Sequence, residues 1–151
     1  MQRGGFDCVL GNPPWERVAL EDKEFFARKG SSIAQIKTTS ARKKAIECLS
    51  ETDPALYTAY CIVKEFSLRQ GLFFQESTRY SYGASGRLNT YPLFTELSIQ
   101  CLRLEASTGL VVPTGISTDA PMEPFWRYIT KEKLLASMID FENKQGIFSS
   151  V

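Results

Sequence analysis

Short apolar runs in this 151-residue chain predict three strands. The first run, Phe6–Gly11, stops at two consecutive prolines, which have no N–H and a fixed φ and therefore cannot continue a sheet ladder. The second, residues 110–113, is apolar throughout and also ends at a proline, which is typical of a buried parallel strand. The third run covers residues 134–141, with a turn expected after it.

Between these runs, apolar residues recur with a helical period. Acidic residues early and basic residues late favour the first helix, and Asp53 with Pro54 forms a typical start for the third. Gly71 is expected to end that third helix. The predicted helices cover residues 21–30, 31–50, 54–71, 91–105 and 121–131.

Strands that alternate with helices define the fold class as α/β, with a mostly parallel sheet and right-handed crossovers. Ligands of such sheets bind beyond the carboxyl ends of the strands. Asn12, Thr114 and Glu142 are all predicted to lie at those ends.

The composition sets limits on the class of protein. A net charge of +1 and 43% hydrophobic residues are ordinary for a globular domain and give no global argument for nucleic acid or membrane binding. No apolar run approaches the ~20 residues needed to cross a bilayer, and the first five residues do not resemble a signal peptide. We therefore expect a cytoplasmic protein without a membrane partner.

Cysteine and histidine usage narrows the chemistry. Cys8, Cys48, Cys61 and Cys101 are widely spaced, so reduced core thiols are expected rather than disulfides. Histidine is absent, which excludes histidine triads and histidine metal sites. No metal site is predicted.

The turn Asn12-Pro13-Pro14-Trp15 is the main candidate site. The Asn12 amide oxygen and the Pro13 carbonyl can both accept hydrogen bonds from a planar NH₂ group, which would activate a poor nucleophile electrostatically. Trp15 can stack on the base that carries this amine, and an adenine would have to be flipped out of its duplex to reach the turn. The alternative is a purely structural Pro-Pro turn whose Trp15 covers a core.

Two groups of basic residues are candidates for DNA contact. Lys43 and Lys44 lie on one predicted helix face with Lys37 and Arg42, and this face either meets phosphates or is simply solvated. Arg79 and Arg87 lie in a turn-rich loop that mixes cations, aromatics and glycines. Such a loop can grip phosphates and stack on bases, but it is equally compatible with an ordinary surface loop.

Four segments in order carry a resemblance to a known family. Residues 6–15 resemble the catalytic motif of the class I, S-adenosylmethionine-dependent N6-adenine DNA methyltransferases, in particular the bacterial type II restriction-methylase fusions. Residues 89–96 resemble the family's Asn-x-Tyr-x-x-Phe-x-Glu helix start, residues 109–113 its fifth strand, and residues 140–148 the region after its sixth.

The resemblance implies a partial Rossmann-like methyltransferase sheet of three mostly parallel strands, with a large helical insertion over residues 16–80. It implies methyl transfer from S-adenosyl-L-methionine to adenine N6 of double-stranded DNA in a restriction–modification system. Asn12 and Pro13 would bind the target amine, Pro14 would complete the motif, and Trp15 would stack on the flipped base. Phe94 would lie near the cofactor's adenine, or be an ordinary core residue.

The chain also departs from the family pattern. The glycine-rich loop that binds the methionine of the cofactor lies before the catalytic motif in the family, and the target recognition domain lies after it; neither is in this sequence. The chain therefore resembles the C-terminal half of a catalytic domain. Its expected partners are the rest of its own polypeptide, with a possible nuclease, and a second copy of the fragment through open strand edges.

Two other functions stay open. A protein-glutamine methyltransferase uses a similar Asn-Pro-Pro-aromatic turn on a side-chain amide. A non-catalytic DNA-binding module would keep the basic helix and the loop over residues 79–87 but tolerate loss of Asn12.

Overall fold

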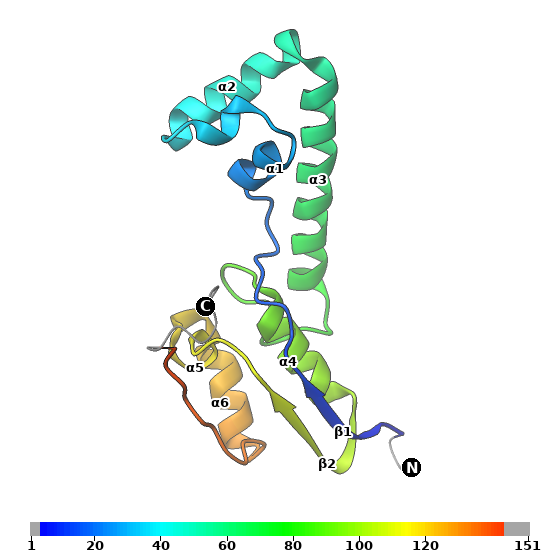
Figure 1. Ribbon diagram of the computed structural model, residues 1–151. Helices are drawn as coiled ribbons and strands as arrows, with labels where there is room; N and C mark the ends of the chain where they lie inside the picture. The colour runs from blue at the N-terminus through cyan, green and yellow to red at the C-terminus, as the bar shows by residue number, and fades with distance from the viewer. Residues whose placement is uncertain (1–3, 144–151) are drawn as a thin grey trace.

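The structure is a computed structural model that describes residues 4–143, and it has a mixed α/β fold (Figure 1). Its regular elements, in chain order, are β1 (Phe6–Gly11), α1 (Asp22–Arg28), the 3₁₀ turn η1 (Ser32–Gln35), α2 (Thr39–Thr52), α3 (Pro54–Glu76), α4 (Thr90–Gln100), β2 (Leu102–Leu110), α5 (Gly115–Thr118), the 3₁₀ turn η2 (Ala120–Met122) and α6 (Glu123–Lys131).

The described sheet has two strands, β1 and β2, which run parallel. The parallel pairing and the position of the first strand confirm the sequence prediction. The prediction of a third strand is wrong, because residues 134–141 form no strand and their side chains are exposed. An apolar run becomes a strand only where a ladder partner satisfies its backbone, and none of the described segments pairs with this one.

The second strand lies earlier in the chain than predicted, because β2 ends at Leu110 and the predicted strand residues 111–113 are not part of it. The helix expected over residues 91–105 ends at Gln100, and β2 starts two residues later. Apolar and polar residues alternate from Leu102 to Ser107, a period of two that suits a strand with one side exposed. Glu105 adopts a positive φ of 63°, and the pairing register with β1 shifts at this part of the strand.

The helical portion also differs from the prediction in its boundaries. The single helix expected over residues 31–50 is interrupted at Ile36, whose backbone is extended, so η1 and α2 are separate. Ser31 caps η1, and the Thr38 hydroxyl caps α2 by accepting a hydrogen bond from Ala41 N at 3.3 Å. Asp53 caps α3 as predicted, but this helix continues beyond Gly71 to Glu76.

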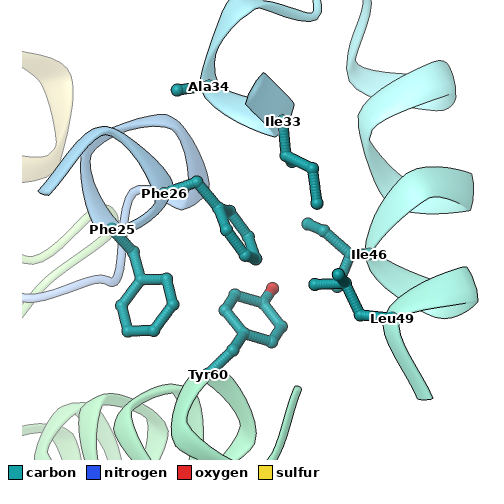
Figure 2. Packing of buried hydrophobic residues seen from close by; sticks show 7 residues of the cluster. All are labelled: Phe25, Phe26, Ile33, Ala34, Ile46, Leu49 and Tyr60. Carbon is teal, nitrogen blue, oxygen red and sulfur yellow. The ribbon is translucent and has the colours of Figure 1, made fainter. Parts of the chain in front are cut away.

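One hydrophobic cluster holds the helical portion together (Figure 2). Phe26 is fully buried, and its ring stacks on Tyr60 with centroids 5.2 Å apart. The Tyr60 hydroxyl donates a hydrogen bond of 2.8 Å to the carboxylate of Asp22, which ties α3 to α1. The buried members of this cluster are Phe25, Phe26, Ile33, Ala34, Ile46, Leu49 and Tyr60.

A second cluster packs α4 against α5 and α6, through Tyr91, Ile116, Phe125 and Ile129. Figure 1 shows that α1 and α2 lie at one end of the molecule, whereas α4, the sheet, α5 and α6 lie at the other. The 23-residue helix α3, roughly 35 Å long, runs from the first group toward the second. The sheet and the basic helix α2 are therefore far apart.

The four cysteines are free thiols, as predicted. The expectation that they are core residues is wrong for Cys8 and Cys48, which are exposed. Cys8 lies in a strand with little cover on either face, and Cys48 lies on the outer side of α2. Within residues 4–143, none of the helices combines the length and the apolar character that a membrane span requires.

Candidate functional site

The predicted turn Asn12–Trp15 directly follows the carboxyl end of β1, next to the point where the parallel strand β2 ends. Pro13 is buried, whereas Asn12 is exposed and Trp15 is 38% exposed. The turn therefore presents an amide and a large part of an indole ring at the edge of the sheet where α/β folds bind ligands. Pro13, the first of the two prolines, packs against the rest of the protein.

Contacts with the end of β2 fix the orientation of the turn. The Gly11 carbonyl accepts a hydrogen bond of 3.1 Å from Val111 N, which extends the ladder by one step past β1. The Trp15 indole Nε1–H donates to the carbonyl of the same Val111 at 3.4 Å. This hydrogen bond holds one edge of the indole ring, and 38% of the Trp15 surface is exposed.

Thr90, at the start of α4, supports the turn from the other side. Its hydroxyl donates a hydrogen bond of 2.5 Å to the Pro14 carbonyl and accepts one of 3.1 Å from Glu16 N. Its own N–H donates to the Glu16 carbonyl at 2.9 Å. The carbonyls of Gly11 and Pro14 are both engaged, so the backbone of Asn12 and Pro13 between them is held at each end.

The chain beyond the turn pairs with the loop that precedes α4. Arg17 and Asn89 form an antiparallel bridge, and Val18 N donates to the Leu88 carbonyl at 3.0 Å. The exposed Arg87 precedes Leu88 in this loop, on the side of the pairing that leads away from the turn. Among the predicted DNA-contacting residues, Arg87 is thus the one that lies in the segment paired with the chain after the turn.

A buried carboxylate shapes the same loop. Glu96 on α4 is 5% exposed, and its oxygens accept hydrogen bonds from three consecutive backbone N–H groups, those of Ser81 (2.8 Å), Tyr82 (3.2 Å) and Gly83 (2.7 Å). A Cβ at Gly83 would lie 2.7 Å from the Pro92 carbonyl, so only glycine fits at this close approach.

Helix α4 therefore contacts the turn through Thr90 at its first residue and the loop through Glu96 two turns later. Sequence reasoning assigned no role to either residue. The one available signal was that both lie inside the Asn-x-Tyr-x-x-Phe-x-Glu segment, six residues apart.

Tyr91 links α4 to the segment that follows β2. Its side chain is buried, which raises the pKa of its hydroxyl, and the nearby Asp119 carboxylate raises it further. A Cβ at Gly115 would lie 3.0 Å from the Tyr91 hydroxyl and 2.7 Å from Asp119, so the backbone of α5 approaches both groups closely. This contact positions the chain after β2 against α4.

The remaining predicted residues lie apart from the turn. Phe94 is 46% exposed on α4, so the expectation of an ordinary core residue is wrong for it. Arg79 is exposed at the far end of the loop, where its carbonyl accepts a hydrogen bond from Gln100. Lys43 and Lys44 are exposed on α2, at the opposite end of the molecule from the sheet (Figure 1). Glu142 follows no strand, so its predicted place at a strand end is wrong.

Two cavities among the described residues lie apart from the turn. The two best-defined cavities are lined by residues of α6 with Tyr82, and by residues of α1, η1 and α2. Neither includes Asn12, Trp15 or Phe94. The residues that line these two cavities are therefore not those of the predicted turn.

Comparisons of the chain with known protein families, with curated proteins and with solved structures gave no match.

Proposed function

We propose that this chain is the base-binding half of a site-specific DNA methyltransferase, which transfers a methyl group from S-adenosyl-L-methionine to adenine N6 in a restriction–modification system. The observation that carries the proposal is the position of Asn12–Trp15. The turn lies at the carboxyl end of a strand in a parallel pair, and Val111 and Thr90 hold it from two sides.

In this proposal the amine of the base binds to two oxygen acceptors. The Asn12 side-chain oxygen and the Pro13 carbonyl accept its two N–H bonds, which increases electron density on the nitrogen before any proton leaves. The hydrogen bonds on the Gly11 and Pro14 carbonyls pre-organise this backbone, so little reorganisation is needed when the base arrives. This explains how the reaction proceeds in a chain without histidine.

The base itself stacks on Trp15. The indole N–H donates to the Val111 carbonyl, which orients the ring, and the exposed part of Trp15 supports stacking of the base on it. An adenine inside a duplex cannot reach a turn at a strand end, and the substrate is therefore a flipped base. In this proposal Arg87, which lies in the segment paired with the chain after the turn, contacts the phosphates that flank the base.

In this proposal the methyl donor is bound by another part of the enzyme, because neither of the two best-defined cavities includes residues of the turn. Each strand of the sheet pairs on one edge only within the described residues, and β1 also exposes the apolar side chains of Phe6 and Leu10. A neighbouring strand of the cofactor-binding half would pair with this edge and cover these side chains. Phe94 on α4 is then available to contact the adenine of the cofactor.

The test is substitution of Asn12 by alanine in the full-length polypeptide. We expect Asn12→Ala to abolish methylation of duplex DNA, measured by transfer of labelled methyl groups, while DNA affinity in a filter-binding assay stays within about twofold. The matched control is Gln75→Ala, which removes an exposed amide on α3 and should leave both readouts unchanged. Retained methylation in Asn12→Ala would contradict the proposal.

The same assay separates the other two functions. A glutamine-containing peptide methylated in place of DNA, with the same loss in Asn12→Ala, identifies a protein-glutamine methyltransferase. DNA binding without methylation of either substrate identifies a non-catalytic module.

A further inference from the structure

A second cavity of about 380 Å³ lies in the helical portion, far from the turn. Its walls come from α1, from η1 and from the residues that precede and begin α2. Three of its lining side chains are cationic: Lys23, Lys37 and Arg42. The other lining residues are Ala34, Gln35 and Ile36.

The positive charge of the residues that line this cavity is not balanced by an acidic lining residue. None of its lining residues is acidic, although the chain as a whole has nearly equal numbers of acidic and basic residues. The two carboxylates that flank Lys23 on α1 have other partners. Asp22 accepts a hydrogen bond from the Tyr60 hydroxyl, and Glu24 forms an ion pair with Arg28 at 3.9 Å. Three cationic residues therefore line this cavity without a carboxylate among its lining residues.

Arg42 is held at the wall of the cavity. One of its terminal nitrogens, Nη2, donates a hydrogen bond of 2.5 Å to the Ile36 carbonyl, which fixes the guanidinium before any ligand binds. Its Nε is buried and has no hydrogen-bond partner among the described residues. A buried N–H without a partner is costly, but this atom is closed off from the cavity, so a ligand there would meet the terminal nitrogens of Arg42 instead.

We propose that this cavity is a binding site for a phosphate group. A guanidinium gives directional hydrogen bonds to phosphate oxygens, and two lysine ammonium groups supply the rest of the positive charge. The volume is sufficient for a phosphate together with the group that carries it. The ligand is a phosphate of the nucleic-acid backbone or a free phosphate. The site is inferred from the cavity alone, and only the DNA source rests on the proposed function.

Only some of the basic residues that were predicted to share one helix face line this cavity. Lys37, Arg42, Lys43 and Lys44 were expected to form one basic face, but Lys43 and Lys44 do not line the cavity. Lys23, from a different helix, takes their place. This division supplies a matched pair of variants, since each pair removes two exposed lysines from the same end of the molecule.

The experiment compares Lys23→Gln/Lys37→Gln with Lys43→Gln/Lys44→Gln. Binding of inorganic phosphate is measured by titration calorimetry, and binding of duplex DNA is measured over a range of salt concentrations. We expect the cavity pair to weaken phosphate binding about tenfold and to reduce the slope of log affinity against log salt by about one to two, since each phosphate contact contributes roughly 0.9. The control pair should leave phosphate binding unchanged. Circular dichroism checks that both variants are folded.

Each outcome decides the proposal. If the cavity pair weakens DNA binding more than the control pair does, the ligand is the DNA backbone. If only phosphate binding differs between the two pairs, the site takes a free phosphate. If the pairs behave alike in both assays, or the control pair has the larger effect, the proposal is overturned. Methylation by Asn12→Ala is a separate readout, so failure here leaves the proposed function untouched.

Discussion

The hydroxyl of Thr90 donates a hydrogen bond of 2.5 Å to the carbonyl oxygen of Pro14, a residue 76 positions earlier in the chain. This bond joins the start of α4 to the candidate base-binding turn. Together with the Trp15–Val111 hydrogen bond, it makes the orientation of the turn depend on two segments that are remote in sequence. Substitution of Thr90 is therefore the most direct test of whether this orientation matters.

Thr90→Val keeps the shape of the side chain but removes its hydroxyl. The Pro14 carbonyl and Glu16 N–H each lose a partner, which should cost about 1 kcal/mol of stability because the groups are exposed enough to bind water instead. If the turn binds the reacting base, a small displacement should also lower the methylation rate of the full-length enzyme by about tenfold or more. Single-turnover kinetics would measure this rate.

Thr58→Val is the control for that experiment. The Thr58 hydroxyl donates to the Pro54 carbonyl within α3 and contacts nothing near the turn. Its substitution should leave the methylation rate unchanged. Equal rates for Thr90→Val and the wild type would show that the Thr90 contact is structural only.

The buried Glu96 should be among the most sensitive positions in the fold. The Glu96 carboxylate accepts hydrogen bonds from three backbone N–H groups of the loop. Glu96→Gln replaces it with an amide that has one acceptor oxygen, so at least one of these N–H groups loses its partner. We expect a loss of about 2–3 kcal/mol in the free energy of unfolding, measured by urea denaturation.

Glu65→Gln provides the comparison for Glu96→Gln. Glu65 forms an exposed ion pair with Arg69 on α3, and such pairs contribute at most about 1 kcal/mol. A loss for Glu96→Gln no larger than that for Glu65→Gln would mean that the loop over Ser81–Gly83 does not depend on the buried carboxylate.

Because of Tyr60, we expect the free energy of unfolding to fall as the pH rises into the alkaline range. Burial raises the pKa of its hydroxyl above the ordinary value of about 10, and the hydrogen bond to Asp22 adds to this effect. The folded state therefore holds the phenol proton more tightly than the unfolded chain does. The resulting stability is fully present below pH 10 and is lost as the pH rises from about 10 toward the folded pKa.

Tyr60→Phe removes both the proton and the hydrogen bond to Asp22. At pH 7 it should lower the free energy of unfolding by about 1.5–3 kcal/mol, because the acceptor is a charged carboxylate. Above pH 10 the difference between the variant and the wild type should shrink. Urea denaturation at pH 7 and near pH 11 measures both effects. A difference that stays constant with pH, or one matched by Tyr80→Phe outside the cluster, would contradict this account.

The order of the elements could be predicted from sequence better than their boundaries. The run Phe6–Gly11 ends at two prolines, and this local chemistry is sufficient to define β1. A helical period fits four apolar residues here, namely Leu97, Cys101, Leu102 and Leu104. The alternation of apolar and polar residues after Leu102 fits a strand equally well. Pairing with β1 decides between the two, and no local pattern carries that information.

The candidate site was predictable only in part, for the same reason. Asn12–Trp15 can be read from sequence because prolines fix their own backbone. Thr90 and Glu96 act through contacts with Pro14 and the loop over residues 81–83, and these contacts depend on how α4 packs. The cavity at Lys23, Lys37 and Arg42 likewise requires three segments to meet.

The open edge of β1 leads to the last prediction, that the chain self-associates. Each of the two strands has one edge without a ladder partner among the described residues, and unpaired edges can bind the edge of another copy. Leu10 on β1 is 79% exposed, so a charge at this position is tolerated in the monomer but opposes stacking of a second sheet. Leu10→Lys should therefore reduce the average mass that light scattering reports at high protein concentration.

The exposed apolar face of α3 is the competing surface. Ile62→Lys introduces the same charge on α3, where Ile62 is 63% exposed. If the strand edge is responsible for self-association, this variant should show the same average mass as the wild type. A reduction in mass by Ile62→Lys alone would assign self-association to α3. A strictly monomeric wild type at high concentration would contradict self-association through the edge of β1.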